Sequence, residues 1–356
     1  MANTLNSRFQ RGKTTVMAKV AVIIACFNSE NTVTRAIQSI LNQSFRDLIL
    51  YVIDDASTDN SLAKIMSIKD ERLRVIKLEC NLGPSGARNQ ALFKAKEEYV
   101  AILDADDFSY KERLQVQVDY LSNNQSIALV GGLTNTLQNK QTITSSRPYT
   151  SCGTRWIQLF NNCFSHSTVM YRRDAAIHLG GYDTSLSQAE DFALFSQLTI
   201  QNASVNIPTV FSFYTSNNDG ISKVFPDTLI ACAISVVKKN ILSLTEITIS
   251  KETAAILHLV KRDYKHKTIL KAVSINTYCL KQFLNDNIVD YISKKEITHQ
   301  QIMLTFFLIQ LIPFKKWYLI WELTKNILSM NPFLLIDCLF IKVIIPNWLK
   351  KLLKSH

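Results

Sequence analysis

The sequence predicts an α/β protein with a mostly parallel sheet flanked by helices, followed by a helical carboxyl-terminal region. Short runs rich in β-branched residues alternate with amphipathic stretches through the first 110 or so residues, which is the pattern of a parallel sheet with crossover helices. Acidic residues directly follow two of the expected strands. Residues 225–356 hold 18 Lys and Arg against 9 Asp and Glu, whereas residues 1–224 hold 22 against 20. This change in charge places a boundary near residue 225.

Four strands are expected in the first part of the chain, at residues 19–25, 48–53, 74–78 and 100–103. The first, KVAVIIA, is continuously apolar rather than alternating. Such a run indicates a strand that is buried on both faces. In a parallel sheet of this kind, ligands bind beyond the carboxyl ends of the strands.

The segments between these strands are expected to be helical. Ser29 is the expected N-cap of the first helix, and Ser57 and Thr58 are expected to open the second. Residues 83–95 predict a turn and a third helix. The apolar face of the first helix follows i, i+3, i+4 spacing and consists of Val33, Ala36, Ile37, Ile40 and Leu41.

The middle of the chain is mixed, and the remainder is mostly helical. Strands are expected at 127–131 and 169–171, and a helix at 191–199. From about residue 226 onward, lysines lie on the polar faces of apolar helices. Gly180 and Gly181 predict a helix C-cap and a turn.

Three carboxylates occur within four residues at the end of the fourth strand: Asp104, Asp106 and Asp107. They repel one another unless a cation lies among them. Their oxygens suit Mg²⁺ or Mn²⁺, and a pyrophosphate would complete the coordination. A turn followed by a helix cap is the alternative interpretation, because Asp is common in both.

Two further acidic residues, Asp54 and Asp55, follow the second strand. One of them is in a position to accept a hydrogen bond from a nucleotide base or ribose. An N-cap with first-turn carboxylates is the alternative, and it would account for Ser57 and Asp59.

Arg88 follows a Gly-Pro-Ser-Gly turn at the start of the third helix. Backbone N–H groups and a guanidinium could meet a phosphate together there. A surface ion pair is the alternative. The segment reads G-P-S-G-A-R-N rather than G-x-G-x-x-G, so a dinucleotide site is disfavoured.

Seven short motifs together resemble one known family: ACFNSE (25–30), VIDDASTDNS (52–61), NLGPSGARNQAL (81–92), LDADD (103–107), SHSTVMYRR (165–173), GGYD (180–183) and AEDFALF (189–195). They occur in the order seen in glycosyltransferase family 2, the inverting enzymes with the GT-A fold. The resemblance covers roughly residues 19–225. It implies a nucleotide-sugar donor, most often UDP-linked, a divalent metal (Mn²⁺ or Mg²⁺) and inversion at the anomeric carbon.

The resemblance also implies a role for individual residues. Asp104 would contact the ribose or the metal, Asp106 would bind the metal, and Asp191 would be the general base. His166 and Glu190 would border the acceptor. The nucleotide would be contacted by Ala25, Phe27, Asn28, Asp55 and Arg88: the first three would line the base pocket, and Asp55 would contact the base itself.

Two local features bear on these roles. Ser187-Gln188-Ala189-Glu190 matches a capping box, which predicts that Glu190 reaches back to the helix start and leaves Asp191 as the free carboxylate. The alternative interpretation is that Asp191 only complements the helix dipole. Many relatives carry an Arg and a His after the base helix, whereas residues 213–222 here contain neither. This departure leaves diphosphate closure and the acceptor undefined.

The carboxyl-terminal region contains no catalytic motif. Its apolar runs at 302–314 and 333–345 have 13 residues each, short of the ~20 that a spanning helix needs. Residues 348–354 form a basic amphipathic segment containing Trp348, typical of an in-plane membrane anchor. Packing of these helices on the first domain or on a second subunit is the alternative.

Composition narrows the location and the partners. The 7 cysteines form no C-x-x-C pair, so a zinc site and a disulfide framework are disfavoured and a reducing compartment is expected. The first 18 residues contain no apolar stretch and are expected to be a disordered tail. The expected location is cytoplasmic, on the inner face of the cell membrane. Basic residues lie among apolar helices without interleaved aromatics, which favours lipid over nucleic acid.

The sequence therefore predicts a glycosyltransferase with a catalytic domain at 19–225 and a helical, basic region at 226–356. It would transfer a sugar to a hydroxyl of a glycan or lipid-linked glycan in cell-surface polysaccharide synthesis. A sugar-nucleotide pyrophosphorylase is a rival, but it needs a Gly-rich loop where this chain has Phe27-Asn28-Ser29. A non-catalytic sugar-nucleotide-binding module is a second rival, disfavoured because Asp104, Asp106 and Asp191 are all present.

Overall fold

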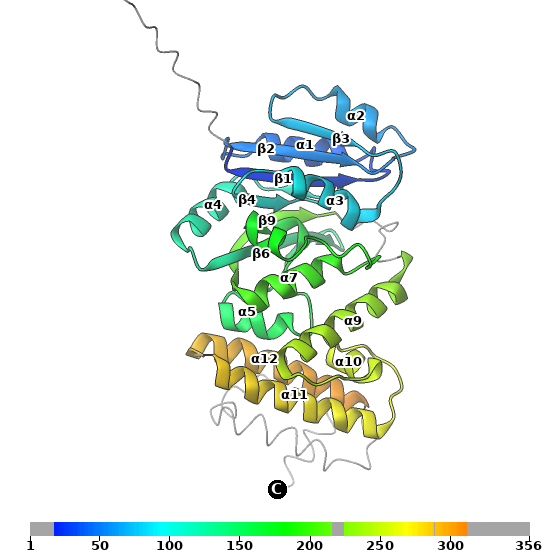
Figure 1. Ribbon diagram of the computed structural model, residues 1–356, viewed down its shortest axis with the longest axis vertical. Helices are drawn as coiled ribbons and strands as arrows, with labels where there is room; N and C mark the ends of the chain where they lie inside the picture. The colour runs from blue at the N-terminus through cyan, green and yellow to red at the C-terminus, as the bar shows by residue number, and fades with distance from the viewer. Residues whose placement is uncertain (1–17, 216–223, 288, 312–356) are drawn as a thin grey trace, which may run out of the picture.

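The computed structural model describes residues 18–215, 224–287 and 289–311 (Figure 1). A nine-stranded sheet with the order β3-β2-β1-β4-β8-β6-β9-β5 forms one end of the molecule, and β7 pairs with β6. Helices cover the sheet, and a group of carboxyl-terminal helices occupies the opposite end in Figure 1.

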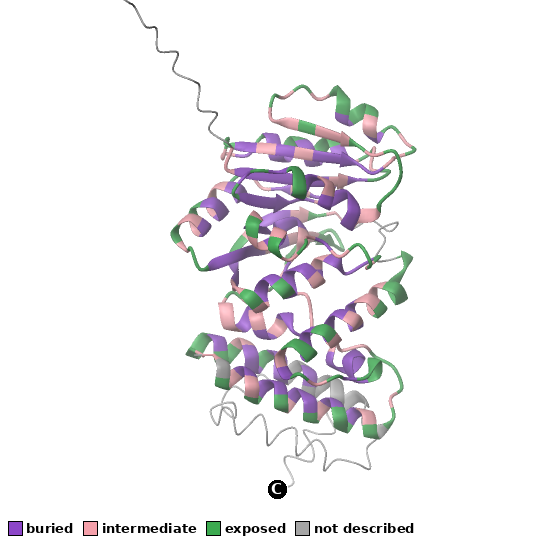
Figure 2. Ribbon diagram, in the orientation of Figure 1, coloured by how far each residue is buried: buried purple, intermediate pink, exposed green. Residues whose placement is uncertain are grey.

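The first half of the sheet is parallel. It contains β1 (Val20–Cys26), β2 (Leu48–Asp54), β3 (Leu73–Lys77) and β4 (Tyr99–Ile102). Each lies within one residue of its expected bounds. Every residue of β4 is buried, as are six of the seven in β1, because both faces of the sheet are covered by helices (Figure 2).

The second half of the sheet is mixed. β8 (Met170–Arg172) runs antiparallel to β4, and β6 (Ile127–Gln138) runs antiparallel to β8. β9 (Ala203–Tyr214) is parallel to β6. Only β8, β5 (Phe108–Ser109) and β7 (Gln141–Thr144) oppose the common direction, so the predicted mostly parallel sheet is confirmed.

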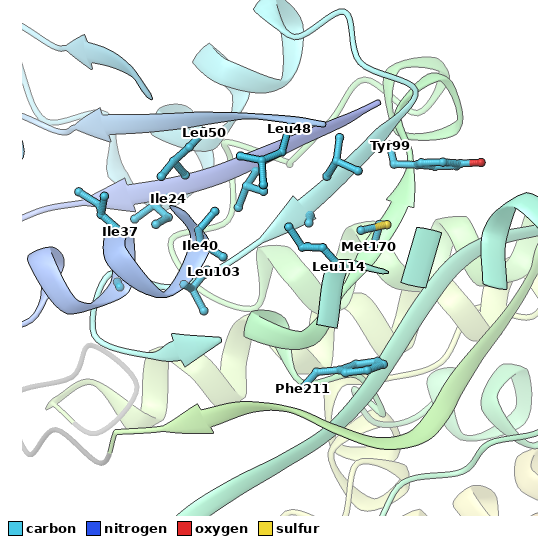
Figure 3. Close-up of a cluster of buried hydrophobic side chains, with 14 of the residues drawn as sticks. Ile24, Ile37, Ile40, Leu48, Leu50, Tyr99, Leu103, Leu114, Met170 and Phe211 are labelled. Carbon is cyan, nitrogen blue, oxygen red and sulfur yellow. The ribbon is translucent and has the colours of Figure 1, made fainter. Parts of the chain in front are cut away.

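Two apolar layers cover the two faces of the sheet. On one face, α1 (Val33–Leu41) and α4 (Arg113–Asn123) pack against β1, β2 and β4. Figure 3 shows Ile37 and Ile40 of α1 beside Ile24, Leu48 and Leu50. On the other face lie α3 (Gly83–Lys94), α6 (Arg173–His178) and α7 (Glu190–Gln201). All five apolar residues predicted for the first helix are buried.

Helix starts are the least accurate part of the sequence prediction. Helix α1 begins at Val33 with Thr32 at the N-cap, and α2 (Ser61–Ser67) begins three residues after Thr58. The hydroxyl of Ser29 donates to the carbonyl of Phe27 instead of capping α1. The predicted turn at Gly180 and Gly181 is confirmed, since both have positive φ and follow the end of α6.

A third apolar cluster joins the carboxyl-terminal helices to the sheet domain. It contains side chains of α5 (Ser151–Gln158), α7, α9 (Pro226–Thr245), α10 (Lys251–Leu257), α11 (His266–Asp286) and α12 (Tyr291–Leu311). Trp156 of α5 is fully buried there; its ring lies 5.2 Å from that of Phe283, and its Nε1 donates to Gln300 at 3.0 Å. The helical prediction beyond residue 226 is therefore confirmed for the described residues.

Among the described helices, α9 alone is long and apolar enough to cross a membrane. In the structure it packs against α7, α10 and α11, and its inward face is part of the third cluster. Three predicted features lie wholly or almost wholly outside the described residues: the disordered tail up to residue 17, the apolar run 333–345 and the basic segment 348–354. Of the apolar run 302–314, residues 302–311 are described.

Candidate active site

The predicted site residues gather at the carboxyl ends of β1, β2 and β4. Cys26 of β1 is level with Asp54 of β2, and the amide of Asp55 donates to the carbonyl of Cys26 at 2.8 Å. Strand β4 ends at Ile102, and Asp104 follows it after the buried Leu103. The acidic strand ends predicted from the sequence therefore share one edge of the sheet.

The loop after β1 lies at this edge and exposes an aromatic side chain. Phe27 is 47% exposed, which leaves an aromatic ring available for a ligand, and Ala25 is partly buried at the end of β1. Asn28 has a φ of 48°, a conformation that Asn tolerates better than most residues. Its Oδ1 accepts from the amide of Thr58 at 2.8 Å, and its amide donates to Ser57 Oγ. Asn28 thus fixes the loop to the segment between β2 and α2.

Asp55 is buried and directed toward the start of α3. Its Oδ1 accepts from the amide of Leu82 at 2.7 Å, and its carbonyl accepts from Asn81 Nδ2. Burial raises the pKa of this carboxyl. The structure gives Asp55 a role in shaping the turn before α3, and its contact with a base stays a prediction.

Four charged or titratable side chains form a charge cluster: Arg88 and Glu190, which are buried, and Asp104 and His166, which are partly buried. Arg88 Nη1 donates to Glu190 Oε1 at 2.6 Å, and its Nη2 donates to Asp104 Oδ1 at 3.0 Å. His166 Nδ1 lies 2.9 Å from the same Asp104 oxygen. Because a carboxylate only accepts hydrogen bonds, Nδ1 carries the proton in this pair. The cluster links the end of β4 to the start of α7.

The charge cluster sets the ionisation of its own members. Burial alone would raise the pKa of Asp104, but His166 and Arg88 together hold that pKa well below its usual range. Burial would lower the pKa of Arg88, but Glu190 and Asp104 raise it above its ordinary value. Asp104 is therefore ionised and Arg88 protonated over the whole physiological range.

Asp106 and Asp107 have the opposite behaviour. Burial and the charge of Asp104 raise the pKa of Asp106 to about 6, and the same two causes raise that of Asp107 to about 7. Asp107 is 2% exposed and accepts from the amide of Thr215 at 3.0 Å. Asp107 therefore anchors the end of β9. It does not cap the next helix, because α4 begins at Arg113, six residues later.

The donor set at this edge fits a divalent cation that a nucleotide also helps to bind. Among the described residues, no group of three or more His, Cys, Asp and Glu side chains converges on one point. Asp104 is already paired with two cationic or donor groups, whereas Asp106 lies beside it with a raised pKa. Two neighbouring carboxylates of this kind suit Mg²⁺ or Mn²⁺, with diphosphate oxygens as further ligands.

Asp191 lies in the first turn of α7 and is partly buried. Its Oδ2 accepts from Asn162 Nδ2 at 2.8 Å, and its Oδ1 accepts from the amide of Phe192 at 2.7 Å. Burial, and next the negative charge of Glu190, raise its pKa above the ordinary value. A raised pKa makes a carboxylate a better proton acceptor.

The predicted capping box is wrong. Helix α7 starts at Glu190 after Ala189, which has a φ of 59° and no side-chain cap, and Ser187 Oγ lies beside Cys232 Sγ. The Glu190 carboxylate reaches Arg88 instead, because a buried guanidinium is a stronger partner than a backbone amide. Glu190 is 8% exposed, so its predicted place beside the acceptor stays a prediction.

His166 is held at this site by three aromatic and polar contacts. Its Nε2 lies 3.4 Å from the Tyr182 hydroxyl, and its ring centroid is 5.9 Å from that of Phe195. With Asp104 on its other nitrogen, His166 has a fixed orientation within the charge cluster.

Sequence reasoning missed two residues that support the acidic strand end. Ser167 Oγ accepts from the Asp104 amide and donates to Asp104 Oδ2, each at 3.1 Å. Arg113 is 1% exposed and donates to the carbonyls of Ile102 and Val169, and burial lowers its pKa to about 9. The sequence signal that could have identified Arg113 is its place on the same face of α4 as Leu114, Val118 and Leu121.

The fold and this site define a GT-A-type α/β protein, and known structures agree. S. aureus TarS 1–349 in complex with UDP-GlcNAc superposes with a TM-score of 0.55 and 19% identity, covering 88% of this chain and 89% of that one. The mannosyltransferase PcManGT from Pyrobaculum calidifontis, in complex with GDP-Man and Mn²⁺, gives a TM-score of 0.52 and 16% identity over 91% and 88%. At these identities the likeness shows the fold.

A family model matches part of the sequence. Residues 21–180 match the family model described as "Glycosyl transferase family 2". This part of the chain is similar to glycosyltransferase family 2, which agrees with the resemblance found in the sequence.

Two curated relatives are similar over about a third of the chain. An uncharacterized glycosyltransferase of Haemophilus influenzae is 36% identical over 117 residues, 32% of this chain and 47% of that one. The E. coli UDP-Glc:alpha-D-GlcNAc-diphosphoundecaprenol beta-1,3-glucosyltransferase WfgD is 33% identical over 112 residues, 32% and 44%. The chain thus spans less than half the length of these two relatives.

Proposed function

We propose that the protein is an inverting glycosyltransferase that moves a sugar from a UDP-sugar to a hydroxyl of a glycan or lipid-linked glycan in cell-surface polysaccharide synthesis. The observation that carries the proposal is the charge cluster. Through Arg88 it joins the acidic end of β4, where a donor diphosphate and cation would bind, to the start of α7, where Asp191 lies.

The similarity to known proteins supports the donor and the acceptor classes. TarS has been crystallised with UDP and with UDP-GlcNAc, and the name of WfgD gives UDP-Glc and a diphosphoundecaprenol-linked GlcNAc. A further relative, 38% identical over 100 residues, is the succinoglycan biosynthesis protein ExoO of Rhizobium meliloti, whose name refers to the synthesis of a polysaccharide. The exposed Phe27 ring and the loop fixed by Asn28 are suitable for stacking a base and holding it at the strand ends.

The proposed reaction is a single displacement. Asp191 accepts the proton of the acceptor hydroxyl while the acceptor oxygen forms a bond to the anomeric carbon. The nucleoside diphosphate leaves with the bonding electrons of the broken C–O bond. Asp106, with Asp104, would hold a divalent cation, which when bound would neutralise charge on the diphosphate. Glu190 is paired with Arg88, so Asp191 is the carboxylate of this helix turn that remains available to the acceptor.

The test compares two carboxylate variants. Purified protein with MnCl₂ is screened against nucleotide sugars for donor hydrolysis and for transfer to a lipid-linked acceptor. We expect Asp191→Asn to bind UDP normally and to lose roughly a hundredfold or more in transfer. Asp174→Asn is the matched control, because that side chain is 83% exposed and its described ion pair is with the neighbouring Arg173. Near-normal transfer by Asp191→Asn would refute the assignment of the base.

A further inference from the structure

The side chain of Asn162 is in direct contact with the proposed base. Its Nδ2 lies 2.8 Å from Asp191 Oδ2. Asn162 belongs to the loop that connects α5 to η1 (His166–Thr168), and it is 29 residues from Asp191 in sequence. No motif in the sequence pointed to it.

The orientation of the Asn162 amide is fixed by its other partners. Its Oδ1 accepts from the backbone amide of Phe164 at 3.2 Å and from Gln158 Nε2 at 3.4 Å. A backbone N–H can only donate, so the oxygen of the amide must face Phe164. The NH₂ group therefore faces Asp191, and the contact is an N–H donor to a carboxylate.

Gln158 in turn is fixed by the sheet domain and by α9. It is 1% exposed, and its Oε1 accepts from the amide of Cys163 at 2.9 Å. Its carbonyl accepts from Ser196 Oγ of α7 and from Asn240 Nδ2 of α9. Gln158 therefore connects α5, α7 and α9, and Asn162 is supported by a rigid, buried set of hydrogen bonds.

We infer that Asn162 is a positioning residue for the base: it fixes the direction of the Asp191 carboxylate and favours its ionised form. The inference rests on the proposed function of Asp191. With Asn162 on Oδ2 and the Phe192 amide on Oδ1, each carboxylate oxygen retains a lone pair for the acceptor hydroxyl.

The other groups that act on Asp191 explain why a donor matters at this position. Glu190 of α7 and burial raise the pKa of Asp191, whereas His166 of η1 and Arg88 of α3 lower it. Both His166 and Arg88 contact the Asp104 carboxylate, and Arg88 also pairs with Glu190. Asn162 is the side-chain donor that the structure places on Asp191 itself, and a hydrogen bond to the charged form of a carboxylate favours that form.

The test is the pH dependence of kcat/KM for transfer in wild type, Asn162→Ala and Asn162→Asp. Loss of the donor should move the acidic limb to higher pH by about one unit. Asn162→Asp keeps the size and shape of the side chain but adds a like charge, so it should move the limb further. UDP affinity should be unchanged in both variants, because Asn162 contacts Asp191 rather than the acidic end of β4.

Asn161→Ala is the matched control, since this half-buried neighbour has the same side chain and its described contact is a backbone bond to Ile157. An acidic limb that stays in place in both Asn162 variants, while Asp191→Asn is inactive, would overturn this inference and leave the proposed function standing. If Asp191→Asn transfers normally, the proposed base fails and the inference with it. If Asn162→Ala does not fold, the isosteric Asn162→Asp decides.

Discussion

Replacing Glu190 by glutamine removes one of the two carboxylates that hold the buried Arg88 guanidinium. The Arg88–Glu190 pair has an N···O distance of 2.6 Å, and its side chains are 10% and 11% exposed. Breaking a buried ion pair from one side typically costs about 3–5 kcal/mol, because an uncompensated charge is left behind. Arg88 keeps Asp104 at 3.0 Å, and the new amide oxygen still accepts a hydrogen bond. We therefore expect a loss of about 2–3 kcal/mol.

The assay is reversible unfolding in urea, supported by thermal melting, where this loss corresponds to roughly 3–4 °C for a chain of this length. Glu98→Gln is the matched control. Glu98 pairs with Arg172 at 3.5 Å with its side chain 51% exposed, so its replacement should cost under about 1 kcal/mol. Equal stability of the two variants would refute the reasoning, because the buried pair would then contribute no more than the exposed one.

The remaining predictions concern the ionisation of the acidic strand end and the carboxyl-terminal region. Asp107 is protonated in the folded protein up to its pKa of about 7 but ionised above about pH 4 in the unfolded chain, so it makes stability fall as the pH rises between these values. Urea titrations in EDTA should therefore show Asp107→Asn gaining stability relative to wild type from about pH 5 to 7.5, and a constant difference would contradict the raised pKa. We also propose that the protein binds anionic membranes peripherally through residues 225–356, with their 18 basic and 9 acidic side chains. Truncation after about residue 330 should weaken sedimentation with phosphatidylglycerol vesicles, and the idea is wrong if the full chain ignores such vesicles at low salt.

The elements of the sheet domain could be predicted from sequence because their signals are local. The run from Val20 to Ile24 is apolar at every position, and the five-residue apolar face of α1 follows helical spacing. A strand that ends in Asp104 must expose that residue at the ligand-binding edge of a parallel sheet. These inferences need only the residues within one element, so the four strands hold to within one residue of the observed bounds and the apolar face of α1 is buried as expected.

Partners across the fold could not be predicted in the same way. A capping box was the best local partner for Glu190, but Arg88, 102 residues away, is the actual one. Asn162 and Asp191 meet because α5 and α7 share a buried layer with α9. The charge shift near residue 225 indicated a separate region, yet its helices complete the core around Trp156.

The sequence by itself thus determined the α/β class, the edge of the sheet where the site lies and the carboxylates that occupy it. Only the tertiary structure decided how those carboxylates are ionised and oriented. The reason is physical: periodicity and strand ends depend on neighbours along the chain, whereas the pKa and direction of a buried carboxylate depend on which distant donors and charges packing brings within about 3 Å of it.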